Sequence, residues 1–131
     1  MKVTRKVSEY MHSPVHTIGA DQTLGHAKHE IYSRNIHHLP ILEGGRCVGI
    51  MSDRDIKLAF AVEKNHPENI LAKDACVTEV YEVSPQTELA VVARHMFEQR
   101  IGSAVIVENG KICGIFTVTD ACKALADICS Q

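Results

Sequence analysis

The most constraining feature of this chain is that it is built twice. The string Gly49-Ile50-Met51-Ser52-Asp53-Arg54-Asp55 returns as Gly114-Ile115-Phe116-Thr117-Val118-Thr119-Asp120, with one offset at both ends, because 114 − 49 = 65 and 120 − 55 = 65. The same offset superposes Leu24 on Leu89 without any gap. Because self-similarity at a fixed period determines architecture before any local signal does, we expect two matching half-units.

The length and charge of the chain limit its class. With 131 residues, it is too short for two fully independent domains, so the half-units should share one core. A net charge of −2 disfavours a nucleic-acid partner, and no stretch approaches the roughly 18 apolar residues that a membrane helix needs. Five cysteines without any Cys-x-x-Cys pair indicate reduced thiols. We therefore expect a cytoplasmic protein that contacts neither nucleic acid nor membrane.

Each copy begins with a strand and a helix. Residues 15–18 and 80–83 are branched or alternating, which is typical of short strands. Apolar residues then recur at three- and four-residue spacing from Leu24 and from Leu89, which predicts a helix in each copy. Thr87 is the expected N-cap of the second of these helices.

A hairpin and a second helix complete each copy. Two apolar runs flank a tight turn at residues 43–46 and again at 108–111, where glycines supply the positive φ angles that a two-residue turn requires. A helix should then begin near Asp55 and near Asp120. The predicted fold class is α+β, with two β-α-β-β-α repeats packed sheet to sheet around a pseudo-two-fold axis, so that equivalent loops face a shared cleft.

In this arrangement the chain resembles a pair of cystathionine-β-synthase (CBS) domains. The residues that carry the resemblance stand in family order and occur twice, over about residues 7–126. We place repeat one at residues 7–62, a connector at 63–73 and repeat two at 74–128. In the first copy the matching segments are Val7-x-x-x-Met11, Leu24-x-x-Ala27-x-x-x-Ile31, Ile36-x-x-Leu39-Pro40-Ile41, the run from Glu43 to Ile50, and Ser52-x-x-Asp55.

The resemblance implies a regulatory module that binds adenine nucleotides or related adenosyl ligands such as AMP, ADP, ATP and S-adenosylmethionine. In family members the hydroxyl of this motif contacts phosphate and its aspartate accepts from the ribose hydroxyls, while backbone near the first strand and hairpin frames the adenine. Carboxylates and hydroxyls beside helix N-termini suit these roles. The implied ligand-binding residues are Thr17, Ile18, His37, His38, Pro40, Ser52, Arg54 and Asp55 in repeat one, and Tyr81, Val83, Thr117, Thr119 and Asp120 in repeat two.

The two copies differ in charge. Arg54 stands next to the aspartate of repeat one, whereas Thr119 occupies the equivalent position. His37 has Gly102 as its counterpart. Because guanidinium binds phosphate in a bidentate manner and histidine gains charge on acidification, we expect repeat one to prefer a phosphorylated ligand. Tyr81 could stack on a base or be a partly buried core residue.

Other interpretations remain open at this stage. The aspartate and hydroxyl of each motif could simply cap a helix. A metal site is disfavoured because His26 and His29 lack a companion motif, and an enzyme is disfavoured because no nucleophile stands in a recognisable pair with a base. The strongest alternative is a ligand-independent dimerisation or interaction module. Relatives commonly form homodimers through their helices, a role open here to Ile56, Leu58, Phe60, Leu125 and Ile128, as is a role in the core.

Overall fold

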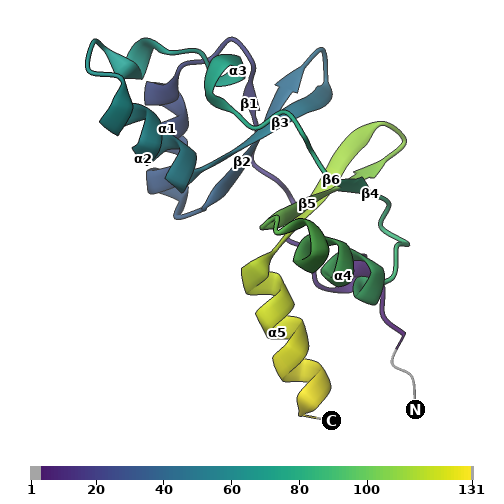
Figure 1. The fold of residues 1–131 in the computed structure, drawn as a ribbon. Helices are drawn as coiled ribbons and strands as arrows, with labels where there is room; N and C mark the ends of the chain where they lie inside the picture. The colour runs from purple at the N-terminus through teal and green to yellow at the C-terminus, as the bar shows by residue number, and fades with distance from the viewer. Residues whose placement is uncertain (1–3, 131) are drawn as a thin grey trace. The chain divides into compact units, whose positions relative to one another are not determined.

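The computed structural model describes residues 4–130 and divides the chain into two compact units. One unit comprises residues 16–80, and the other comprises residues 81–130 together with the N-terminal segment up to residue 15. Figure 1 shows the elements of each unit along the colour ramp from purple to yellow. The predicted α+β class is confirmed, because each unit contains a three-stranded sheet and helices.

The unit of residues 16–80 has the sheet order β1-β2-β3. Strand β1 runs parallel to β2, and β2 pairs antiparallel with β3. Its elements are β1 (Ile18–Gly19), α1 (Leu24–Arg34), β2 (His38–Glu43), β3 (Arg46–Ser52), α2 (Asp53–Val62), η2 (Pro67–Asn69) and α3 (Ala72–Ala75).

The other unit repeats this topology with the order β4-β5-β6. Strand β4 is parallel to β5, and β5 is antiparallel to β6. Its elements are η1 (Val7–Glu9), β4 (Glu82–Val83), α4 (Leu89–Gln99), β5 (Ser103–Glu108), β6 (Lys111–Thr117) and α5 (Val118–Cys129). The two predicted β-α-β-β-α repeats are therefore confirmed, whereas the sheet-to-sheet packing stays a prediction.

The two hairpins are the most closely matched parts of the repeats. Gly44 and Gly45 have φ of 59° and 79°, and Asn109 and Gly110 have φ of 54° and 78°. Two successive positive φ angles are typical of the turn that matches the natural twist of paired strands. The same irregularity in register follows, between Ile41 and Leu42 and at the equivalent place in the second hairpin. The predicted hairpins are confirmed.

Three local predictions need correction. The first strands are shorter than residues 15–18 and 80–83, since only two residues of each pair with the neighbouring strand. Thr87 is not an N-cap; its hydroxyl contacts that of Ser84 at 3.2 Å, and the cap position of α4 falls on Glu88. The helices expected near Asp55 and Asp120 begin two residues earlier, because the hydroxyl residue of each motif takes the N-cap position.

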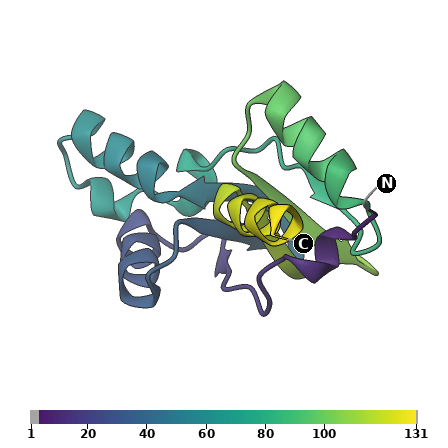
Figure 2. The same ribbon diagram turned by 90° about the horizontal axis from the view of Figure 1, so that it is seen from below.

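The segment before the first strand of each repeat, here called the lead segment, packs on the sheet of the other repeat. The first lead segment is residues 7–12 and the second is 72–77, again 65 residues apart. Val7 is fully buried in the core of the second unit, and Ala72 in that of the first. Figure 2 shows the purple N-terminal segment beside the green and yellow elements of its own unit. The compact units therefore differ from the sequence repeats: the first lead segment joins the second unit, and residues 63–80 join the first.

The lead segments pair with the last strand of the sheet through matching backbone bonds. His12 and Ile115 exchange two N–H···O bonds of 2.8 and 3.0 Å, and Val77 and Ile50 exchange two of 2.9 and 3.0 Å. Both pairs fit the same offset, since 77 − 12 = 65 and 115 − 50 = 65. The two bridges therefore hold residues 12 and 77 at equivalent places in the two units.

A glycine in each last strand permits this approach. A Cβ atom at Gly49 would lie 2.4 Å from Cys76 Sγ and 3.0 Å from the Val77 carbonyl oxygen. A Cβ atom at Gly114 would lie 2.3 Å from Met11 Sδ and 3.2 Å from the His12 carbonyl oxygen. Glycine inside a strand often marks such close contact with another backbone. The lead segments therefore occupy the space that the missing side chains leave.

We predict that Gly49→Ala destabilises the protein by about 1–3 kcal/mol, because the added methyl group overpacks the contact with Cys76. Cys76→Ala should partly restore stability in the double variant, because it removes the nearest atom. Urea unfolding of the two single variants and the double variant forms the cycle that measures this coupling. Additive effects of the two substitutions would contradict the proposed contact.

Candidate functional site

The hydroxyl and carboxylate of the repeated motif cap a helix in the first unit. Ser52 ends β3 and is the N-cap of α2. The Asp55 N–H donates to Ser52 Oγ at 3.1 Å, and the Ser52 N–H donates to Asp55 Oδ2 at 2.8 Å. This reciprocal arrangement is a capping box, which satisfies two backbone N–H groups that the helix leaves without a partner. It fixes the Asp55 carboxylate at the positive end of the helix.

The second unit has a related arrangement at the start of α5, with a different role for the hydroxyl. Thr117 is the N-cap, and its N–H donates to Asp120 Oδ2 at 2.8 Å. The Thr117 hydroxyl also donates to Asp120 Oδ2, at 3.1 Å. The capping interpretation of the motif is therefore correct for both copies. Capping engages only Oδ2 of each carboxylate, so it leaves a ligand role for the other oxygen open.

The other oxygen distinguishes the two copies. In the second unit His12 Nδ1 lies 2.7 Å from Asp120 Oδ1, and Asp120 is only 4% exposed. In the first unit no residue between 4 and 130 donates a hydrogen bond to Asp55 Oδ1, and Asp55 is partly exposed. His12 is not among the residues predicted from the sequence. The repeat alone could not reveal it, because His12 lies in the lead segment of repeat one but contacts the motif of repeat two.

A second lead segment lies near Asp55 without pairing to it. Burial raises the pKa of the Cys76 thiol, and the negative charge of Asp55 raises it further. The following residue, Val77, is 48% exposed. Its side chain has no polar atom. The lead segment therefore borders the Asp55 carboxylate without neutralising it.

Two basic residues, His37 and Arg54, lie at the motif of repeat one. His37 is exposed, and its Nδ1 lies 3.4 Å from Asp53 Oδ2. Burial opposes ionisation of Asp53, but the hydrogen bond and charge of His37, aided by the Arg54 N–H, outweigh it and lower the pKa of the carboxyl. The Arg54 side chain is exposed and forms no ion pair within the described range of 4–130. The guanidinium at the start of α2 is therefore available to an anion.

Burial limits what other predicted residues of repeat one can contribute. Ile18 is 3% exposed and belongs to the core of its unit, and Pro40 is fully buried. Their side chains therefore form structure, and only main-chain atoms at these positions could meet a ligand. Thr17 and His38 are partly exposed.

The remaining predicted residues of repeat two differ in exposure: Tyr81 and Val83 are partly buried, and Thr119 is exposed. The Tyr81 ring stacks on His95 with 3.9 Å between ring centroids, and it packs against the core. Burial raises the pKa of its hydroxyl group. Val83 also packs against this core, whereas Thr119 is exposed. Tyr81 therefore packs against the core, while its proposed contact with a base stays a prediction.

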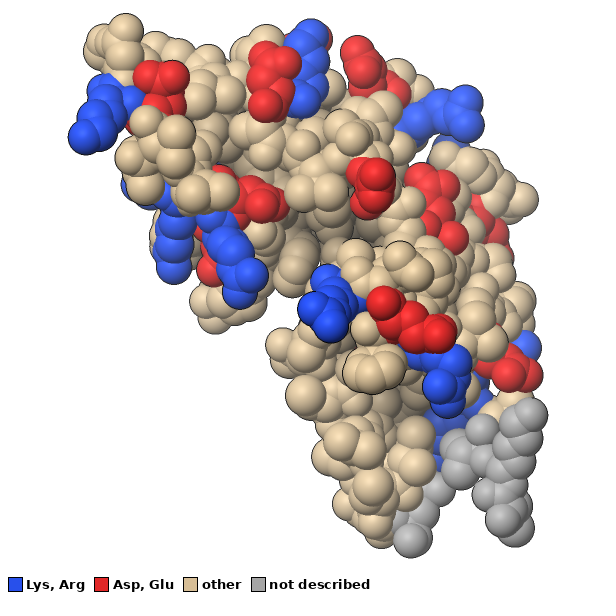
Figure 3. All heavy atoms as spheres, in the orientation of Figure 1, with Lys and Arg blue, Asp and Glu red and all other residues tan. Residues whose placement is uncertain are grey.

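The described residues offer little to the metal-site interpretation. No three His, Cys, Asp or Glu side chains between residues 4 and 130 are placed to hold a metal ion. All five cysteines are free thiols. Within the same range, no helix is long and apolar enough to cross a membrane. Figure 3 shows acidic and basic side chains interspersed on the visible face, with a largely uncharged surface over the C-terminal part of α5.

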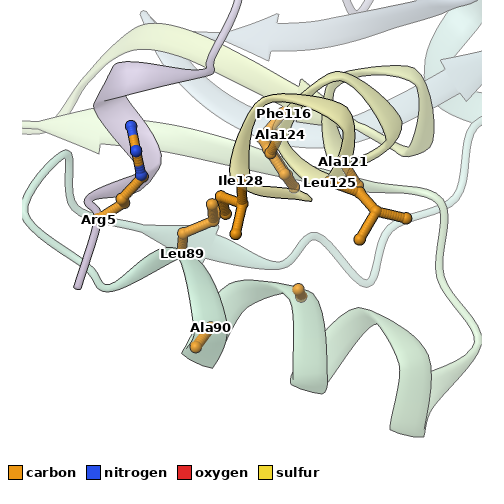
Figure 4. Close-up of a pocket in the computed structure, with 9 residues that line it drawn as sticks. Arg5, Leu89, Ala90, Phe116, Ala121, Ala124, Leu125 and Ile128 are labelled. Atoms are coloured by element: carbon orange, nitrogen blue, oxygen red, sulfur yellow. The ribbon is translucent and has the colours of Figure 1, made fainter. Parts of the chain in front are cut away.

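An apolar hollow of about 300 Å³ lies next to this uncharged surface in the second unit. Figure 4 shows that α4 and α5 supply most of its lining, with Phe116 next to Ala124 and with Arg5 at one side. It contains neither Thr117 nor Asp120. The hollow and the polar motif are therefore separate features of this unit. The lining residues are Arg5, Leu89, Ala90, Ala93, Phe116, Ala121, Ala124, Leu125 and Ile128.

Comparison with solved structures supports the assignment of the fold. The CBS domain pair of protein MJ0100, solved with 5′-methylthioadenosine and S-adenosyl-L-methionine, superposes with a TM-score of 0.85. The match covers 95% of this chain and 98% of that chain at 22% identity. At this level of identity the likeness shows the fold.

Sequence relatives differ in how much of them the chain spans. An uncharacterized 17.7 kDa protein of Acidianus ambivalens is 30% identical over 129 residues, which cover 94% of this chain and 74% of that protein. Inosine-5′-monophosphate dehydrogenase of Korarchaeum cryptofilum is 25% identical over 91% of this chain, but the match spans only 24% of the enzyme. The shared part is thus a module that also occurs within a larger enzyme.

The family comparison covers both repeats. The family model described as CBS domain matches residues 7–62 and again residues 72–127. These two matches include both capped motifs and most of the elements described above. The chain therefore belongs to the CBS domain family and contains a tandem pair of its domains.

Proposed function

We propose that this protein is a regulatory module that binds an adenine nucleotide or related adenosyl ligand, primarily at the motif of repeat one. The observation that carries the proposal is the Asp55 carboxylate, which is fixed by its helix cap through Oδ2 and leaves Oδ1 without a hydrogen-bond donor among residues 4–130. In this role Asp55 accepts hydrogen bonds from the ribose diol. The Ser52 hydroxyl and Arg54 contact the phosphate.

The chemistry of these groups supports the assignment. An ionised carboxylate has several acceptor sites and forms charge-assisted bonds with hydroxyl donors. The Ser52 oxygen accepts from the Asp55 N–H, so its proton remains available to an anionic oxygen. Arg54 adds a positive charge to the same helix turn. The solved complex of MJ0100 with two adenosyl compounds supports the ligand class.

The proposal includes signalling to a separate partner protein. The relative that carries the same module within a dehydrogenase supports a regulatory rather than a catalytic role. A cytoplasmic location and a homodimeric assembly belong to the same proposal. The proposed site also includes His37, His38 and the backbone of Thr17, which we expect to contact the ligand.

A ligand-independent dimerisation module is the second candidate, favoured by exposed apolar side chains on the helices. Leu58 of α2 and Leu125 of α5 are 62% and 63% exposed, and Leu125 lines the apolar hollow. Exposed apolar patches of this kind often mark interaction surfaces. Ile56 is excluded from such a surface because it is buried in the core.

We predict that Asp55→Asn weakens AMP binding at least about tenfold, because it removes the charge that strengthens the bonds to the ribose diol. An asparagine oxygen can still accept from the Ser52 N–H, so the helix cap and the stability of the free protein should change little. Isothermal titration calorimetry measures the affinity, and thermal unfolding measures the stability. Asp120→Asn is the matched control and should leave the site of repeat one intact. Equal AMP affinity in the wild-type protein and Asp55→Asn would exclude the proposed site.

Arg54→Ala should discriminate between ligands with and without phosphate. We expect about tenfold weaker AMP binding and an effect of less than about twofold on 5′-methylthioadenosine, since an exposed charge acts mainly on the anionic group. Lys57→Ala, on the same helix, is the control for a general change in surface charge. Competition titrations of both ligands provide the comparison. An equal loss for both ligands would show that Arg54 does not contact phosphate.

The dimerisation candidate predicts a different response. Leu125→Glu introduces a charge into the apolar surface of α5, so it should shift the protein toward monomer while leaving AMP affinity at repeat one unchanged. Light scattering coupled to size-exclusion chromatography measures the mass, and calorimetry measures the affinity. A protein that forms dimers but does not bind AMP, S-adenosylmethionine or 5′-methylthioadenosine would favour the second candidate.

A further inference from the structure

The pair of His12 and Asp120 has no counterpart in the first unit. His12 Nδ1 lies 2.7 Å from Asp120 Oδ1, while Asp120 Oδ2 accepts from the N–H and the hydroxyl of Thr117. Both oxygens of this carboxylate are thus engaged by the protein itself. Asp120 is correspondingly buried, at 4% exposure. The donor that closes it is 65% exposed and so lies between the carboxylate and solvent.

The Thr117 hydroxyl is also turned inward. Its proton goes to Asp120 Oδ2, whereas the Ser52 oxygen in the first unit accepts from the Asp55 N–H and keeps its proton free. The two groups that would meet ribose and phosphate in repeat two therefore bond to each other and to His12. A ligand would have to break these bonds before it could form its own, and the cost of doing so lowers its affinity.

The backbone explains why the side chain at the bridge position determines whether the aspartate of the motif has a donor. The two-bond bridge to the last strand holds His12 in one unit and Val77 in the other at the same place. The valine side chain cannot donate a hydrogen bond, and Asp55 Oδ1 has no donor among residues 4–130. Positions 12 and 77 thus have the same backbone pairing and differ in the side chain, so each serves as a control for the other.

We propose that His12 is an internal ligand that closes the adenosyl site of repeat two, so that binding there requires His12 to leave Asp120, while Val77 leaves repeat one open. This inference rests on the proposed function, since it concerns the second copy of the same site. It makes residue 12, and its counterpart 77, the position that determines which repeat is occupied.

The test exchanges the two side chains and counts bound AMP by calorimetry. The wild-type protein should bind one AMP per chain with measurable affinity. His12→Val should add a second binding event, because it frees Asp120 Oδ1, and Asp120→Asn in the same background should abolish that event. Val77→His should weaken binding at repeat one at least about tenfold, because it brings the same donor to Asp55.

His12→Asn is the matched control for the size of the side chain. Its amide nitrogen occupies the same place in the side chain as the histidine Nδ1, so it can still donate to Asp120 and should keep repeat two closed. The bridge uses the N–H and carbonyl of residue 12, which every variant retains. Val77 forms the same bridge in the first unit, which shows that this backbone pairing is compatible with valine. Thermal unfolding of each variant without ligand confirms that it is folded.

The outcomes separate the two proposals. If His12→Val still binds a single AMP through an intact Asp55, the inference about His12 is overturned and the proposed function stands. An unchanged AMP affinity in Val77→His would also overturn it, and these two variants act in opposite directions, so a failure to fold in one leaves the other as a test. If neither the wild-type protein nor His12→Val binds AMP, both the proposed function and the inference fail.

Discussion

Each lead segment forms a backbone bridge with the last strand of the sheet on which it packs, β6 for residues 7–12 and β3 for residues 72–77. The arrangement of both motifs depends on this bridge. It exists because Gly49 and Gly114 present no side chain at the crossing. It carries each lead segment onto the sheet of the other repeat and fixes the residue that stands beside each capped aspartate. A substitution at the bridge position therefore changes the chemistry of a motif that lies far away in the sequence but adjacent in the fold.

The capping box explains how one motif can serve both stability and recognition. A helix N-terminus leaves N–H groups without partners, and a hydroxyl with a carboxylate three residues later satisfies two of them. This role needs only one carboxylate oxygen, as the bonds to Asp55 Oδ2 and Asp120 Oδ2 show. The cap also holds the carboxylate in a fixed position before any ligand arrives, which reduces the entropy that binding must overcome.

Much of the fold could be predicted from the sequence because both copies carry the same turn residues and the same apolar spacing. The glycine and asparagine of the turns and the apolar spacing of the helices are local signals, and the elements they predict occur in both units. The prediction of Thr87 as an N-cap was wrong because a hydroxyl residue can close a turn as readily as it can cap a helix. The contact of His12 with Asp120 could not be predicted, since it depends on the exchange of lead segments, and nothing in the spacing of residues 7–12 indicates which sheet they join.

Three differences between the copies act in the same direction. Repeat one has Arg54 where repeat two has Thr119, His37 where repeat two has Gly102, and Val77 rather than His12 at the bridge. Arg54 adds a positive charge and His37 a basic ring at the motif of repeat one, and Val77 leaves Asp55 Oδ1 without a side-chain donor. In the second unit, the basic ring of His12 contacts Asp120 itself. Since the strand pairing of the two units matches, the difference between the two motifs resides in these few side chains. A duplicated scaffold can thus keep its fold while the motif of one copy keeps a carboxylate oxygen free and that of the other is satisfied by the protein's own side chains.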